Sequence, residues 1–129
     1  MGANSIHYNQ INEYMSGHGN FDKPEPGMGA TRFVGSDRYP YVVVDVPTPK
    51  HIRVFWIHDD DFEKMFDKRE NGVMMMKPEY LEKVYAKGLD YFTSYTYRKN
   101  GRWIVKGDDM WATGAIQIGV ADQYLDPCF

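Results

Sequence analysis

Two consecutive β-rich runs constrain the fold of this chain most strongly, because both carry apolar side chains on both faces. The first, YVVVDV, covers residues 41–46, and the second, HIRVFWI, covers residues 51–57. Alternation gives the first run two apolar faces, which are Val42, Val44 and Val46 against Tyr41 and Val43. A sheet with two apolar faces needs cover on both sides, so the pattern predicts a closed barrel or a dimer.

A third β-rich run, TRFVG at residues 31–35, precedes these two. Turn residues at 36–38 and 47–50 separate the three runs, which predicts an antiparallel meander. We therefore expect a mainly β fold of the α+β class, a small antiparallel sheet or barrel with a helical insertion around residues 78–88.

Residues 59–90 are expected to form that insertion. A helix is predicted from Pro78 to Lys87, because proline suits the first turn, Glu79 and Lys83 pair at i,i+4, and Gly88 ends the pattern. Residues 1–26 are polar and broken by glycine and proline, which predicts a partly ordered N-terminal arm. The chain is thus interpreted as one ligand-binding β domain, residues 27–129, with an insertion at about 59–90.

The best-defined local signal is Asn100-Gly101 between two β-rich runs, a pair typical of a two-residue type I′ hairpin. That turn predicts that Arg98 lies opposite Trp103 and Thr96 opposite Val105. The predicted register places five side chains on one face: Phe92, Thr96, Arg98, Trp103 and Val105.

Composition excludes several classes of protein. The 129 residues suit one domain, and a net charge of −3 argues against a protein that coats nucleic acid by charge alone. The single cysteine, Cys128, excludes an internal disulfide framework and is typical of a reducing compartment, so we expect a cytoplasmic protein. We find neither a leader pattern nor an apolar run long enough to span a membrane.

Motifs for chemistry are weak throughout. The run GMGATR, residues 27–32, has Arg32 where the dinucleotide fingerprint needs its last glycine, and it precedes a strand rather than a helix. The cluster His58-Asp59-Asp60-Asp61 lacks metal-ligand spacing, because neighbours on a strand point to opposite faces. We find no nucleophile motif, and we predict a binding protein that is not an enzyme and needs no cofactor or metal.

A basic and aromatic segment indicates what is bound. Four cations, Arg98, Lys99, Arg102 and Lys106, alternate with Tyr95, Tyr97 and Trp103. Such a mixture can pair with phosphate and stack on bases, although cations are also ordinary on an exposed hairpin. The low net charge favours a small nucleotide, which needs only a few arginines, over a long polyanion; nucleic acid is not excluded.

Four segments, at residues 27–31, 36–46, 92–107 and 118–129, carry the patterns GMGAT, SDRYPYVVVDV, FT…RKNGRW…KG and a terminal DPCF. With these patterns the chain resembles the phage anti-Thoeris sponges. The resemblance implies a homo-oligomer in the cytoplasm of an infected bacterium, with ligand sites at subunit interfaces. It also implies an anti-defence function, the sequestration of cyclic ADP-ribose isomers or, in some members, cyclic oligonucleotides.

We expect Arg38, presented by the turn at residues 36–38, to meet phosphates, and Asn100 to bind ribose; a solvated turn residue is the alternative for Arg38. The candidate ligand-binding residues are Arg38, Tyr39, Phe92, Arg98, Asn100, Arg102 and Trp103. Two other functions stay open. One is a small phage-encoded inhibitor or barrel that binds single-stranded nucleic acid or a host protein, and the other is a virion component.

Overall fold

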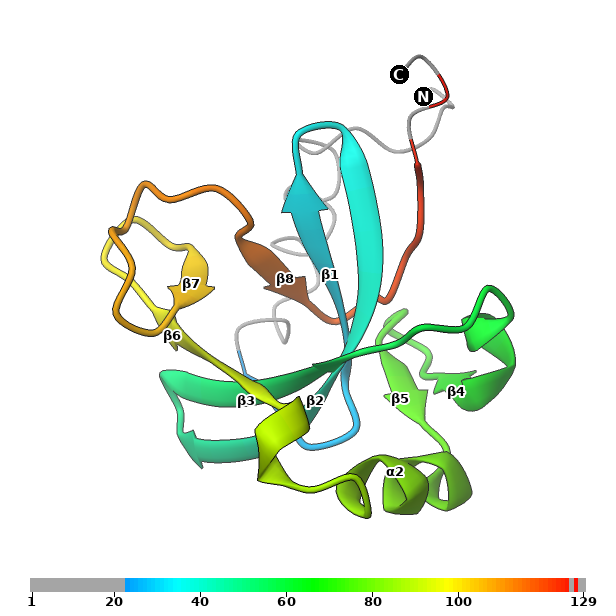
Figure 1. Ribbon diagram of the computed structural model, residues 1–129. Coiled ribbons are helices and arrows are strands. Elements are labelled where there is room, and N and C mark those ends of the chain that lie inside the picture. The colour runs from blue at the N-terminus through cyan, green and yellow to red at the C-terminus, as the bar shows by residue number, and fades with distance from the viewer. Residues whose placement is uncertain (1–22, 126, 128–129) are drawn as a thin grey trace.

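A closed antiparallel barrel forms the centre of the computed structural model, which describes residues 23–125 and 127 (Figure 1). The strands follow one another around the barrel as β1-β2-β3-β6-β7-β8, and β8 pairs back with β1. Their bounds are Gly29–Val34, Asp37–Thr48, His51–Trp56, Thr93–Tyr97, Trp103–Val105 and Ile116–Ile118. The expected mainly β fold is confirmed.

The interior of the barrel is apolar and aromatic. Tyr41 and Val43 of β2 pack there with Ile52 and Val54 of β3. Val46 also packs against this interior cluster, so its predicted place on the face of Val42 and Val44 is wrong. The reason is a shift in the β2–β3 register after Val43, which interrupts the strict alternation.

The outer face of β2 is covered by the segment between β3 and β6. Val42 and Val44 pack there against Phe62, Phe66 and further residues of this segment. Its elements are η1 (Phe62–Met65), β4 (Phe66–Lys68), β5 (Met74–Met76), α2 (Pro78–Tyr85) and η2 (Leu89–Tyr91). One chain therefore covers both apolar faces. The homo-oligomer stays a prediction. A partner chain is, however, not needed to cover the second apolar face of β2.

The helix that the sequence predicts is present as α2, with Pro78 in its first turn and Gly88 at a φ of 94° just beyond it. No described helix is long and apolar enough to cross a membrane. The predicted N-terminal arm lies outside the described residues as far as residue 22, and so does Cys128.

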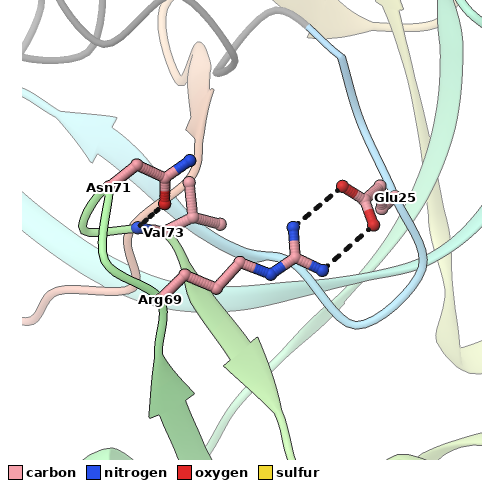
Figure 2. A network of polar contacts seen from close by, with 4 residues as sticks. All are labelled: Glu25, Arg69, Asn71 and Val73. Atoms are coloured by element: carbon pink, nitrogen blue, oxygen red, sulfur yellow. Dashed lines mark hydrogen bonds and ion pairs between the residues drawn. The ribbon is translucent and has the colours of Figure 1, made fainter.

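Figure 2 shows how the insertion is tied to the segment before β1. Arg69 donates from its two terminal nitrogens to the carboxylate oxygens of Glu25, over 3.1 and 3.3 Å. Asn71 accepts a hydrogen bond of 3.1 Å from the backbone N–H of Val73 and so shapes the β4–β5 turn. The Arg69–Glu25 pair is exposed, so its contribution to stability is small.

The β6–β7 hairpin differs from the predicted register by one residue. Tyr97, not Arg98, lies opposite Trp103, and Tyr95 lies opposite Val105. The turn has three residues rather than two: the N–H of Arg98 bonds to the carbonyl of Arg102, and that of Gly101 to the carbonyl of Arg98. Gly101 has a φ of 82°, as in the three-residue hairpin with a glycine bulge. The change moves Arg98 to the face opposite Trp103.

Candidate functional site

The predicted phosphate ligand Arg98 uses its side chain within the protein. Its Nε donates to Thr96 Oγ1 at 2.7 Å, and its terminal nitrogens donate to the carbonyls of Asp108 (2.7 Å) and Val105 (2.9 Å). The bond to Asp108 joins the hairpin to the start of the β7–β8 loop, residues 106–115. Arg98 therefore makes contacts within the protein, and a ligand role for it stays a prediction.

Arg102 and Asn100 hold the same loop further along. Arg102 donates to the carbonyls of Met110 and Ala112, each at 2.8 Å, and Asn100 Nδ2 donates to Met110 at 3.0 Å. Side-chain donors from one hairpin thus fix the path of the loop. A ligand role for these two residues stays a prediction that the geometry does not favour.

Arg38 lies inside β2, so its predicted position in a turn is wrong. The turn consists of residues 35 and 36 alone, because Gly35 adopts a φ of 60° and Val34 already pairs with Asp37. Arg38 is only 5% exposed. Its guanidinium lies 3.4 Å from the carboxylate of Asp122 and 5.0 Å from the ring centroid of Tyr124.

The predicted aromatic ligands lie on two sides of the barrel wall. Phe92 packs edge-on against Phe55, with 6.3 Å between ring centroids, in the outer cluster around α2. Trp103 is buried inside the barrel beside Tyr97. The shared face predicted for Phe92, Arg98 and Trp103 is therefore wrong, and the seven candidate residues do not form one site. Tyr39 alone of them belongs to the arrangement described next.

Arg32 points into the barrel, and the sequence analysis did not select it. It lies opposite Tyr39 in the β1–β2 pair and opposite Ile116 in the β1–β8 pair. Directly opposed residues share a face, and both of these pack with the interior cluster. Arg32 is half-buried at this end of the interior.

Two tyrosines of the interior are electrostatically coupled to Arg32. Burial raises the pKa of Tyr41, and the charge of Arg32 opposes that shift. Burial raises the pKa of Tyr95 to about 12, with the Tyr41 phenol adding to the shift and Arg32 opposing it. Both hydroxyls therefore stay protonated at neutral pH. A guanidinium and two O–H groups, all able to donate, belong to one neighbourhood.

The charge of Arg32 has no carboxylate partner among the described residues. Its Nε donates to the carbonyl of Gly114 over a long 3.3 Å. A Cβ on Gly114 would lie 2.6 Å from a terminal nitrogen of Arg32, so the guanidinium packs directly on this glycine. A half-buried arginine without an anion is unusual, because burial of a charge is costly unless it is paired.

An aromatic surface continues from Arg32 across the next two strands. Tyr39 contacts Trp56 edge-on, with 5.5 Å between ring centroids, and Trp56 is 40% exposed. The ring of His58 lies 4.0 Å from that of Trp56. We name Arg32, Tyr39, Tyr41, Trp56 and Tyr95 the Arg32 cluster. It combines a cation, hydroxyl donors and an exposed indole.

In the sequence, Arg32 stands out as a charged residue inside the β-rich run at residues 31–35. Arg32 served only to reject a dinucleotide motif, although alternation along TRFV separates it from Thr31 and Phe33. Alternation alone does not show which of the two sides faces the interior, because Thr31 and Phe33 are themselves buried.

No group of three histidine, cysteine, aspartate or glutamate residues is placed to hold a metal ion within the part of the chain that the structure describes. No protein-family model matches the chain, and neither a curated protein nor a solved structure shows significant similarity to it. The Arg32 cluster itself is therefore the feature from which a function can be inferred.

Proposed function

We propose that the protein is a non-enzymatic binding protein that sequesters a small nucleotide-derived ligand at the Arg32 cluster. The observation that carries this proposal is the inward-facing Arg32, half-buried beside tyrosine hydroxyls with no described carboxylate to neutralise it. An anionic group of the ligand would supply the missing partner. Charge-assisted hydrogen bonds of this kind are about twice as strong as neutral ones.

The layout of the cluster favours a ligand that carries a ring as well as an anionic group. Arg32 lies on β1 and Trp56 on β3, two strand spacings or about 10 Å apart. A bare anion reaches only the guanidinium, whereas a nucleotide can place its phosphate at Arg32 and its base on Trp56. The net charge of −3 favours such a small ligand over a polynucleotide.

Sequestration requires no bond to be formed or broken, and the cluster suits that role. Tyr41 and Tyr95 have raised pKa values, so their hydroxyls act as donors at neutral pH and not as bases. The resemblance to anti-Thoeris sponges makes cyclic ADP-ribose isomers the first ligands to test. In that setting the protein removes an immune signal from the cytoplasm of an infected bacterium, as a homo-oligomer.

Calorimetry with a cyclic ADP-ribose isomer tests the proposal on wild type, Arg32→Gln and a matched control, Arg69→Gln. Arg69 is an exposed arginine of the insertion, paired with Glu25. We expect Arg32→Gln to weaken binding about 10- to 100-fold, which corresponds to about 1.5–3 kcal/mol for a charged hydrogen bond, and Arg69→Gln to bind as wild type.

Mass spectrometry after heating separates a sponge from an enzyme. Protein incubated with a nucleotide extract should release its ligand chemically unchanged. Release of a product, or equal affinity of Arg32→Gln and wild type, contradicts the proposal. Oligonucleotide binding that falls steeply with salt, in the absence of small-ligand binding, indicates the single-stranded nucleic-acid alternative instead.

A further inference from the structure

A second group of donor side chains lies on the outer wall of the barrel, on the face opposite the interior. In the β3–β6 pair, Arg53 is opposed to Ser94. On the other side of Ser94, the N–H of Lys106 bonds to the Ser94 carbonyl at 2.9 Å. Arg53, Ser94 and Lys106 therefore form one row across three adjacent segments, with a hydroxyl between two cations.

The next row of the same face adds two more polar groups. His51 of β3 is opposed to Thr96 of β6. The Oγ1 of Thr96 accepts a hydrogen bond from Arg98 Nε, which leaves the hydroxyl hydrogen of Thr96 available for donation. Alternation places Ile52 and Tyr95, the neighbours of these residues, in the interior.

Positive charge exceeds negative charge on this wall. Lys106 is exposed and has no ion pair with a described carboxylate. Arg53 is half-exposed and paired with Asp45 of β2, whose charge also reaches Tyr85 of α2. Asp45 is thus one acidic group that any bound anion has to tolerate, and it is already engaged by Arg53.

His51 has a polar ring atom without a described partner on this wall. Its Nε2 is buried and has no hydrogen-bond partner among the described residues. Burial lowers the pKa of His51, and the charges of Lys106 and Arg53 lower it further, while Asp45 opposes them. A buried polar atom without a partner is costly, and a ligand group that forms a hydrogen bond with it removes that cost.

We propose that this wall is a phosphate-binding site, in which Lys106 and Arg53 flank the anion and Ser94 and Thr96 donate to it from below. We name these four residues and His51 the Ser94 site. It is separate from the Arg32 cluster, because its residues lie on the opposite face of the barrel wall. A phosphate group suits it, since its charge and several acceptor oxygens match a surface of donors.

The phosphate comes either as the free ion or as a monoester on a larger molecule, and both arms are measured. NMR titrations of the His51 ring with inorganic phosphate, glycerol 3-phosphate, sulfate and chloride at constant ionic strength compare wild type with Lys106→Gln and Ser94→Ala. Lys68→Gln, an exposed lysine on β4, is the control. Because Lys106 is an exposed side chain, we expect its variant to fold.

We expect saturable binding of at least one phosphate compound, with an upward shift of the His51 pKa on binding. Lys106→Gln should bind this compound at least tenfold more weakly than wild type, and Lys68→Gln should bind it as wild type does. Arg32→Gln should retain this binding, so failure at one site is distinguishable from failure at the other. A linear response equal to that with chloride, or wild-type affinity in Lys106→Gln, overturns the proposal.

Discussion

Replacement of Gly114 by alanine tests whether the position of Arg32 matters for binding rather than for folding. Gly114 has a φ of +81°, and an added Cβ would lie 2.6 Å from one terminal nitrogen of Arg32 and 2.9 Å from its Nε. The positive φ costs alanine about 1–2 kcal/mol. The clash itself costs little stability, because the end of an arginine side chain moves easily, but the guanidinium has to leave its place.

Gly107 provides a matched control in the same loop. Its φ is +93°, and no described atom lies within 4 Å of a Cβ built on it. Gly107→Ala therefore carries the same backbone cost without the displacement of Arg32. Urea unfolding should give similar losses for the two variants, about 1–2 kcal/mol each.

Calorimetry then separates the two variants. We expect Gly114→Ala to lose about 10- to 100-fold in affinity for a nucleotide ligand, as Arg32→Gln does, while Gly107→Ala binds as wild type. In the Arg32→Gln background, Gly114→Ala should add no further loss, because both changes remove one interaction. Equal weakening by Gly107→Ala, or additive losses in the double variant, refutes the role assigned to Arg32.

Three further outcomes follow from the barrel and its hairpin. Arg98→Leu removes three hydrogen bonds, to Thr96 of β6, Val105 of β7 and Asp108 of the β7–β8 loop, so its urea midpoint should fall by the equivalent of about 1–3 kcal/mol; an unchanged midpoint contradicts the anchoring role. Gly101→Ala places a side chain at a φ of 82° and should cost about 1 kcal/mol, measured in the same way. Tyr95, with a pKa of about 12, should ionise well above the ordinary tyrosine value near 10 in an ultraviolet titration. Because its folded pKa lies above its unfolded value near 10, its contribution to the unfolding free energy should be lost as pH rises from about 10 to 12.

The barrel was predictable because its signals are local and repeated. Apolar residues on both faces of residues 41–46 require cover on both sides, and the structure provides it with a closed interior and the insertion around α2. Whether a second chain or the same chain supplies that cover is not a property of the strand itself. The helical pattern at residues 78–87 predicts a helix, but it does not show that this helix packs on the outer face of β2.

The hairpin shows where local signals are insufficient. Asn100-Gly101 is compatible with a two-residue turn and with a three-residue turn that has glycine at its end. Packing of Tyr97 against Trp103, with 5.1 Å between their ring centroids, and the bonds from Arg98 to the loop accompany the second form. A difference of one residue reverses every side chain, so the predicted face failed although the hairpin itself was correct.

The predicted grouping of the ligand-binding residues was wrong for a related reason. Arginines 98 and 102 looked available because the sequence does not show which backbone carbonyls the β7–β8 loop presents to them. Arg32 looked unimportant because its neighbours Tyr41 and Tyr95 come from other strands and meet it only after closure. Its buried neighbours Thr31 and Phe33 make an outward direction the simpler expectation for Arg32 from the sequence alone.

NMR of the arginine Nε–Hε groups tests the central claim most directly, because it reports which guanidinium meets the ligand. The Arg32 signal is assigned by its loss in Arg32→Lys, and the spectrum is followed as a cyclic ADP-ribose isomer and simple nucleotides are added. We predict that the Arg32 signal moves in a saturable way with one of these ligands, while the signals of Arg69 and Arg98 stay in place. A saturable shift of Arg98 or Arg102 with no change at Arg32, or no shift at any arginine, contradicts the account.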